Sequence, residues 1–302
     1  DIEKKIYKVK YCVGCELEKT DSELVDGGCP IHPELEIEII NEENYFFKFS
    51  NYQEKLLDLY KSDPDFVVPE SRLNEITKFV ESGLEDFSIS RLKEKMPWGV
   101  PVPGDEGHVM YVWFDALVSY ISALGWPKNK KRFEEFWGTK DSPNAIQIAG
   151  KDNLRQQSAM WQAMLLSAGL PNSRQIYIEG FITSGGQKIS KSSGKVIDPF
   201  ELVEKYGTDA VRYYLARHIH PFEDSDFTEE KFREAYNAHL ANGLGNLVAR
   251  VMKLAETNLK EPISPPASAP FAKEYTDAIE AFEFNKAMDF VWEKIQALDK
   301  RI

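Results

Sequence analysis

The chain has 302 residues, of which 42% are hydrophobic and 28% charged, and its formal net charge is -12 at pH 7. This composition is typical of a globular protein of about two domains and excludes the disordered and fibrous classes. An acidic chain repels nucleic acid on average, which disfavours a coating or packaging protein but permits a local basic face that meets RNA.

The first forty residues combine β-like runs with a cluster of metal-binding residue types. Cys12 and Cys15 form a C-x-x-C pair, and Cys29 and His32 form a C-P-x-H pair. Two tight turns of this kind supply the four tetrahedral ligands of a structural Zn²⁺. The alternative is three buried free cysteines beside an unrelated surface histidine. An odd, clustered set of cysteines is a poor disulfide framework, so we expect a reducing, cytoplasmic compartment.

The middle of the chain alternates predicted helices and strands. Residues 44–95 show amphipathic spacing typical of helices. Residues 97–104 form a proline-rich connection. Residues 108–183 then follow the order strand, helix, strand, helix, strand, which predicts half of a parallel α/β sheet. No apolar run approaches the length of a membrane span, so we expect no membrane contact.

The last third is predicted to be helical, with a linker at residues 261–270 and a final helix at residues 271–301. One helix pair cannot bury its apolar faces alone, so we expect the bundle to continue beyond Ile302. The chain begins with Asp1 rather than an initiator methionine, and we therefore expect the gene to begin upstream.

The segment GGQKISKSSGK at residues 185–195 places lysines among glycines and serines. By itself this pattern predicts a solvated surface loop. Its KISKS core, residues 188–192, resembles the KMSKS signature of class I aminoacyl-tRNA synthetases, with isoleucine in place of methionine.

Three further stretches resemble methionyl-tRNA synthetases specifically, so that the resemblance covers nearly the whole chain. They are YVWFDALVSYISALGWP, AGKDNLRQQSAMWQAMLLSAGLP, and the cysteine cluster followed by ENYFFKFSNYQEKLLDLY. The resemblance implies ATP-dependent activation of L-methionine and its transfer to tRNA(Met). It also implies an α/β fold built around the second half of a Rossmann-type parallel sheet. The implied regions are a connective-peptide domain (1–105) with a zinc knuckle (12–32), the half-sheet (106–185), the KMSKS loop with a stem-contact region (186–227), and the start of a helical anticodon-binding bundle (228–302).

The resemblance assigns roles to individual residues. Lys188, Ser190 and Lys191 would stabilise negative charge on the triphosphate of ATP, which enters with Mg²⁺, whereas Lys195 is expected to be a plain surface lysine. Gly150, Asp152, Gly180 and Phe181 would contact the ribose and adenine of ATP. The methionine pocket would comprise Trp113, Ala116, Leu117, Tyr120, Asn153 and Gln157.

Several of these assignments have structural alternatives. Asp152 is also a suitable N-cap for the following helix. Trp113, Ala116 and Tyr120 have the spacing of an ordinary core-facing helix side. Gln157 stands where the family usually has histidine, which puts strict methionine specificity in question. Arg91 is a weaker candidate for binding phosphate or organising the pocket, with a surface salt bridge as its alternative.

None of the five histidines begins an H-x-G-H motif, which the first half of a class I nucleotide-binding fold carries. The resemblance therefore implies a fragment, inactive alone, whose partner is the N-terminal half, supplied in the same protein or as a separate chain. Two alternatives stay open: a non-catalytic fragment that binds tRNA or protein, and a class I synthetase for another apolar amino acid.

Overall fold

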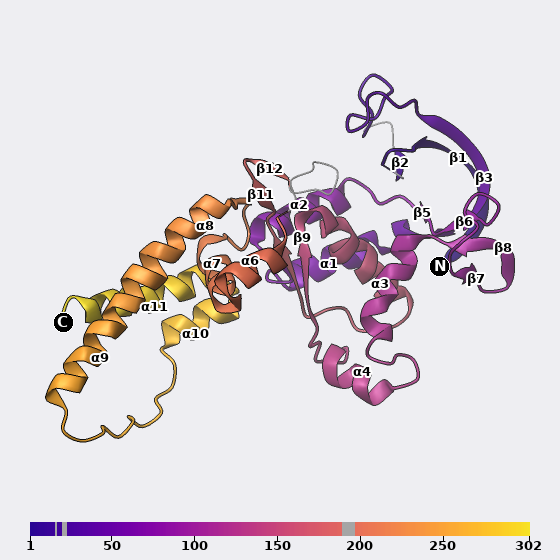
Figure 1. Ribbon diagram of the computed structural model, residues 1–302. Helices are drawn as coiled ribbons and strands as arrows, with labels where there is room; N and C mark the ends of the chain where they lie inside the picture. Colours follow the sequence, from indigo (N-terminus) through magenta and orange to yellow (C-terminus); the bar gives the residue numbers. More distant parts are fainter. Residues whose placement is uncertain (16, 20–22, 189–196) are drawn as a thin grey trace. The chain divides into compact units, whose positions relative to one another are not determined.

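The computed structural model describes residues 1–15, 17–19, 23–188 and 197–302 (Figure 1). It contains two compact units, Asp1–Ile178 and Glu179–Ile302. This division is coarser than the four regions predicted from the sequence, and their boundaries remain predictions. Within the described ranges, no helix has both the length and the apolar content needed to cross a membrane.

The first unit begins with a long antiparallel ribbon. Strands β1 (Ile2–Cys12) and β3 (Glu38–Phe47) pair from Ile2 opposite Phe47 to Tyr11 opposite Glu38. Strands β2 (Leu17–Lys19) and β5 (Phe87–Ser88) complete the sheet in the order β2-β1-β3-β5. The prediction of helix over residues 44–95 is wrong at both ends, because the residues up to Phe47 continue β3 and residues 87–92 contain the strands Phe87–Ser88 and Ser90–Leu92.

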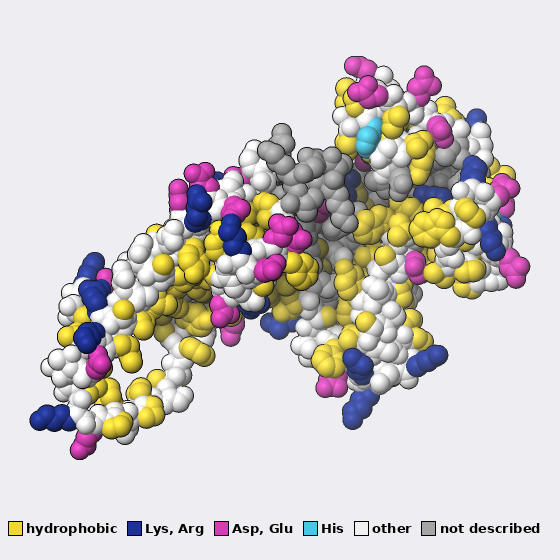
Figure 2. All heavy atoms as spheres, in the orientation of Figure 1, with side chains coloured by type: hydrophobic (Ala, Val, Ile, Leu, Met, Phe, Trp, Pro, Cys, Tyr) yellow, Lys and Arg dark blue, Asp and Glu magenta, His cyan; other side chains and the backbone are white. Residues whose placement is uncertain are grey.

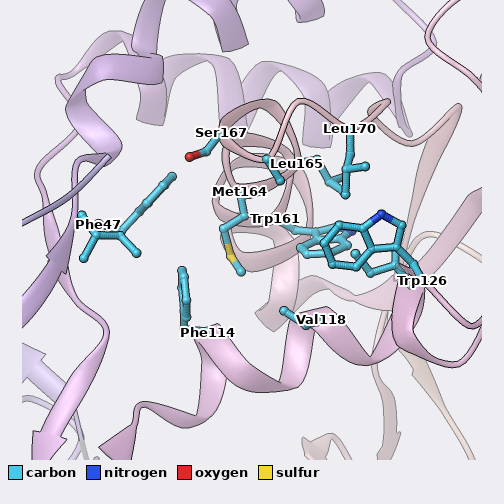
Figure 3. Close-up of a pocket in the computed structure, with 12 residues that line it drawn as sticks. Phe47, Phe114, Val118, Trp126, Trp161, Met164, Leu165, Ser167 and Leu170 are labelled. Atoms are coloured by element: carbon cyan, nitrogen blue, oxygen red, sulfur yellow. The ribbon is translucent and has the colours of Figure 1, made fainter. Parts of the chain in front are cut away.

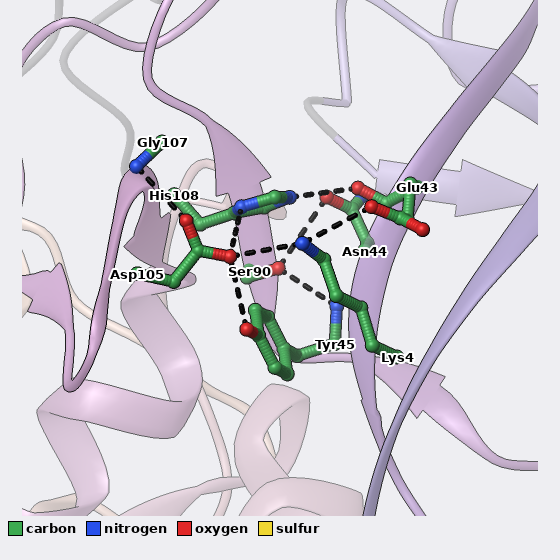
Figure 4. A network of polar contacts seen from close by, with 8 residues as sticks. All are labelled: Lys4, Glu43, Asn44, Tyr45, Ser90, Asp105, Gly107 and His108. Atoms are coloured by element: carbon green, nitrogen blue, oxygen red, sulfur yellow. Dashed lines mark hydrogen bonds and ion pairs between the residues drawn. The ribbon is translucent and has the colours of Figure 1, made fainter.

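A polar network joins this ribbon to a small antiparallel sheet of β6 (Ser90–Leu92), β8 (Asp105–Met110) and β7 (Pro101–Val102) (Figure 4). Lys4 Nζ and the Tyr45 hydroxyl both donate to Asp105 Oδ2, each at 2.9 Å. His108 Nε2 donates to the backbone carbonyl of Glu43 at 2.8 Å. The Lys4 ammonium, followed by the Tyr45 hydroxyl, holds the pKa of the Asp105 carboxyl well below its usual range. The carboxylate therefore anchors the ribbon at neutral pH.

A second sheet of the first unit has the order β4-β10-β9, formed by Val67–Val68, Gln175–Glu179 and Ile146–Gly150. Strand β10 lies in the centre and runs parallel to β4, with Ile176 opposite Val67. The prediction that the strand near residue 108 belongs to this sheet is wrong, since β8 pairs antiparallel with β6 and β7. A parallel partner of β10 is instead β4, whose two residues are too few to show a period.

Helices pack around this sheet in one hydrophobic core. Leu56, Ile76, Trp161 and Ile176 are each at most 2% exposed within it. A π-helical segment, Gln156–Met160, precedes α5, and the buried Tyr60 hydroxyl donates to its Ser158 carbonyl at 2.6 Å. The helices are α1 (Gln53–Ser62), α2 (Glu70–Glu81), α3 (Val112–Ser122), α4 (Lys130–Trp137) and α5 (Trp161–Ser167).

The second unit combines a three-stranded sheet with helices. The sheet has the order β12-β11-β13, formed by Gln187–Lys188, Ile182–Ser184 and Ser225–Asp226. Tyr213 of α7 packs on Trp292 of α11 with ring centroids 4.6 Å apart. The helices are α6 (Pro199–Tyr206), α7 (Thr208–His218), α8 (Glu229–Ala235), a π-helical segment (Tyr236–Gly245), α9 (Asn246–Asn258), α10 (Lys273–Glu280) and α11 (Phe284–Asp299).

The end of the chain departs from the prediction of one final helix. Phe282 adopts a left-handed φ of 59° and separates α10 from α11, although no glycine or proline marks the break. Residues 261–270 carry neither helix nor strand, as predicted for the linker. Along α9, Val248, Val251, Met252 and Leu254 are exposed. On the face shown in Figure 2, basic and acidic side chains are interspersed over the helices of this unit.

Candidate active site and metal centre

The structure brings the four predicted metal ligands together at the tip of the ribbon. One ligand atom from each of Cys12, Cys15, Cys29 and His32 lies within 4.8 Å of all the others. Cys15 Sγ is 3.4 Å from Cys29 Sγ and 3.2 Å from His32 Nδ1. Ligands of a tetrahedral Zn²⁺ at ~2.0–2.3 Å from the metal are spaced by roughly 3.5–3.8 Å, so this arrangement is close to a zinc site.

The chemistry of the thiols and the backbone around them also fits a cation. Burial opposes ionisation of Cys29, but the backbone N–H groups of Ile31 and His32 outweigh it and lower its pKa to about 6. Burial, followed by the neighbouring Cys29, raises the pKa of Cys15 to about 11. A cation between the sulfurs would favour the thiolate form of these cysteines. A Cβ atom on Gly14 would lie 2.6 Å from His32 Cγ, so this position must be glycine for His32 to face the sulfurs.

The predicted methionine-binding face lies on the open side of α3. Ala116 is exposed and Tyr120 is 40% exposed, whereas Leu117 and Ile121 on the core side are 2% and 3% exposed. Trp113 is half-buried on the same side as Tyr120. Ala116 and Tyr120 are therefore not part of the core of this unit, whereas Leu117 is.

The other side of α3 borders an apolar cavity of about 190 Å³ (Figure 3). Phe114, Val118 and Met164 line it, so it is distinct from the predicted methionine-binding face. Trp161 lines the cavity and also places its ring 6.2 Å from that of Tyr120. Its indole N–H is buried without a hydrogen-bond partner among the described residues. Sequence reasoning missed Trp161, since its only signal is apolar helical spacing.

Gln157 is buried and hydrogen-bonded to Tyr120. It is 4% exposed, and its Nε2 donates to the Tyr120 hydroxyl oxygen at 2.8 Å. Gln147 Nε2 in turn donates to Gln157 Oε1 at 3.1 Å. Gln147, like Ser173 behind it, was not singled out from the sequence, and the only available signal was a polar residue inside the apolar run AIQIAG.

The predicted ATP contacts are divided between the two units. In the first, Gly150 ends β9 and exposed Asp152 follows in a 3-10 turn, where Asn153 Nδ2 donates to Asp152 Oδ1 at 3.3 Å. In the second, a Cβ atom on Gly180 would lie 2.3 Å from the backbone of Glu223. The Phe181 N–H donates to Asp224 Oδ1 at 3.0 Å. Gly180 thus has a packing reason to be glycine that is independent of ATP.

The lysine segment begins on a tight hairpin. Gly185 and Gly186 adopt φ of 62° and 77° between β11 and β12, as a two-residue hairpin turn requires. Asp226 Oδ1 accepts from the Gly186 N–H at 2.9 Å, and this bond is the largest cause that lowers the pKa of the Asp226 carboxyl. Lys188 is the last residue of β12. Ser190, Lys191 and Lys195 lie outside the described residues.

Arg91 anchors the start of α3. Its guanidinium donates to Ser88 Oγ at 2.9 Å and to the Ser90 carbonyl at 2.7 Å. It also lies 4.3 Å from the ring centroid of Tyr111, the residue that precedes α3. Arg91 thus links residues of β5 and β6 to the residue before α3, and its role in the pocket remains a prediction.

Comparison with known proteins identifies the family. The family described as tRNA synthetases class I (M) matches residues 1–252. A methionine–tRNA ligase of Nostoc sp. is 44% identical over 97% of this chain and 57% of its own length, and that of Thermotoga maritima is 39% identical over 99% and 49%. Methionyl-tRNA synthetase of Mycobacterium tuberculosis, in complex with methionyl-adenylate, has a TM-score of 0.86 and 34% identity over 99% of this chain and 61% of that chain. The chain thus spans about half the length of its curated relatives. On these grounds it belongs to the methionyl-tRNA synthetases of class I.

Proposed function

We propose that the chain is part of an enzyme that activates L-methionine with ATP and transfers it to tRNA(Met). The observation that carries the proposal is the similarity, over 99% of the chain, to a synthetase structure that contains methionyl-adenylate. In this reaction a methionine carboxylate oxygen bonds to the α-phosphorus of ATP, and the bond to the departing pyrophosphate breaks. Negative charge grows on the phosphates, so positioning and charge stabilisation are the protein's main contributions.

The triphosphate of ATP, which carries Mg²⁺, would be bound by the lysine segment. Lys191 would stabilise the departing pyrophosphate, with Lys188 assisting and Ser190 donating to phosphate. The Gly185-Gly186 turn tied to Asp226 supports this role, because it holds one end of the segment on a defined hairpin. Gly150, Asp152, Gly180 and Phe181 would contact the ribose and adenine.

The methionine side chain would lie on the open face of α3. Trp113, Ala116 and Tyr120 would line it, with Asn153 and Gln157 from the segment after β9 and Leu117 supporting it from the core. The hydrogen bond from Gln157 to Tyr120 supports this assignment, because it joins the two elements that would enclose the ligand. A thioether suits an aromatic wall, with its sulfur near a ring edge.

Cys12, Cys15, Cys29 and His32 would hold a structural Zn²⁺. Four protein ligands leave no open position, so the ion would stabilise the fold of the ribbon tip rather than take part in catalysis. The regions 186–227 and 228–302 would contact the stem and the anticodon of tRNA(Met), and the enzyme would act in the cytoplasm.

Two lysines of one segment provide the test. In the full-length protein that carries this chain, Lys191→Ala should lower kcat for methionine-dependent ATP–pyrophosphate exchange by roughly 100- to 1,000-fold, the usual effect of removing a transition-state charge contact. Methionine affinity, measured by equilibrium binding, should change little. Lys195→Ala is the matched control and should keep kcat. Equal loss of activity in both variants, or loss of methionine binding in Lys191→Ala, would refute the assigned role.

A further inference from the structure

Polar side chains form a continuous hydrogen-bonded chain inside the first unit. Ser173, Gln162, Gln147 and Gln157 are 2%, 0%, 6% and 4% exposed. We call these four residues the amide relay. The relay ends at the hydroxyl of Tyr120, which is 40% exposed. Buried amide groups destabilise a core unless they are hydrogen-bonded. Because each member of the relay is hydrogen-bonded to the next, each side chain is held in one orientation.

The direction of the relay is set by the backbone. Gln162 Oε1 accepts from the Ser173 backbone N–H at 3.1 Å, and Gln162 Nε2 donates to the Gln157 backbone carbonyl at 3.0 Å. An N–H can only donate and a carbonyl can only accept, so these two bonds decide which end of the Gln162 amide is oxygen. Asn172 Nδ2 donates to the same Oε1 at 3.1 Å and reinforces this orientation.

The orientation of the Gln162 amide determines the direction of the remaining hydrogen bonds in the relay. Gln162 Nε2 also donates to Ser173 Oγ at 3.1 Å, and Ser173 Oγ lies 2.6 Å from Gln147 Oε1. A separation of 2.6 Å is typical of an O–H donor and short for an N–H donor, so Ser173 donates its proton to Gln147. Gln147 therefore turns Nε2 to Gln157 Oε1, and Gln157 turns Nε2 to Tyr120. The Tyr120 oxygen is an acceptor in this bond, and its own proton points away from Gln157.

We propose that Ser173, Gln162 and Gln147 are positioning residues that set the polarity of the amino-acid pocket. They hold Gln157 so that the Tyr120 O–H is left as a donor for the substrate side chain. This inference rests on the proposed function. A thioether sulfur is a weak acceptor and a methylene group is not, so the relay favours methionine over its isostere norleucine. If the relay reversed, Gln157 Oε1 would accept the Tyr120 proton and this preference would fall.

The test uses two buried serines in the full-length protein. Ser173→Ala breaks the relay, and Ser158→Ala is its matched control. Ser158 is 0% exposed and follows Gln157 directly, but its hydroxyl has no hydrogen-bond partner in the described part of the chain. In ATP–pyrophosphate exchange, Ser173→Ala should raise KM for methionine roughly three- to ten-fold, the effect of one neutral hydrogen bond. KM for norleucine should stay within about two-fold, as should both constants in Ser158→Ala.

A double-mutant cycle separates positioning from general damage. Tyr120→Phe should lower the preference for methionine, and adding Ser173→Ala to it should lower the preference no further. If Ser173→Ala does not give a folded protein by circular dichroism, Gln147→Leu interrupts the next link and should give the same pattern. If Ser173→Ala raises KM equally for methionine and norleucine, or leaves the preference for methionine over norleucine unchanged, the positioning role of the relay is refuted while the proposed function stands. A folded wild-type protein without methionine-dependent exchange would instead overturn the proposed function, and the relay's role with it.

Discussion

Gly14 gives a quantitative test of the metal centre. In Gly14→Ala the new methyl would lie 2.6 and 2.7 Å from two ring carbons of His32 and 2.8 Å from Leu35 Cδ1. Carbon atoms prefer separations of about 3.5–4.0 Å, so the overlap with the ring is close to 1 Å. The end of the Leu35 side chain can move, but His32 can turn away only by leaving the sulfurs. Overpacking of this kind costs about 1–3 kcal/mol, which corresponds to zinc binding weakened roughly 5- to 150-fold.

The matched control is Gly28→Ala in the same knuckle. Its nearest contact would be the Val25 carbonyl oxygen at 3.7 Å, an ordinary van der Waals distance. The zinc affinity of each variant, made in the full-length protein, is measured by competition for Zn²⁺ with a chromophoric chelator. We expect Gly14→Ala to bind zinc more weakly and Gly28→Ala to match the wild type. Equal affinities for the two variants would refute the placement of His32 among the metal ligands.

Two further predictions concern the pocket and the ribbon. Gln157→His should change the ratio of kcat/KM for methionine over leucine, because an imidazole cannot accept from Gln147 and donate to Tyr120 with the geometry of an amide. An unaltered ratio would mean that Gln157 does not face the ligand. Asp105→Asn should speed amide hydrogen exchange in residues 2–12, since it removes the charge that holds Lys4 and Tyr45. Because the pKa of Asp105 is depressed in the folded protein, its stabilisation is complete above the unfolded carboxyl pKa of ~4 and is lost as pH falls below it. Exchange in wild type should therefore not change between pH 7 and 5 once corrected for the intrinsic rate, and a loosening of the ribbon within that window would contradict this assignment.

Local patterns predicted the elements with strong periodicity. The spacing of Trp113, Ala116 and Tyr120 placed them on one face of a helix, and the structure has α3 there. Spacing alone did not decide which face is buried, because both sides of VWFDALVSYIS carry apolar residues. The core side was decided by packing of Leu117 and Ile121 against residues distant in sequence.

Elements that depend on distant partners could not be predicted. Strand β4 is only two residues long and exists because β10 pairs with it, whereas β8 carries apolar residues only at its end, Val109 and Met110, and pairs antiparallel with β6. Gln147 is a polar residue inside the apolar run AIQIAG, and its burial depends on Gln157 and Ser173, which satisfy its amide from distant positions in the sequence. Asp226 gave no signal, since its role is to accept from a glycine N–H 40 residues away.

Methionine-dependent ATP–pyrophosphate exchange by the full-length, zinc-loaded protein tests the central claim most directly. We predict exchange that requires methionine, is saturable, and is lost when Lys191 is replaced by alanine in a protein that remains folded. A folded, zinc-loaded protein that shows no exchange with methionine would contradict the claim. Exchange with another apolar amino acid in preference to methionine would also contradict it.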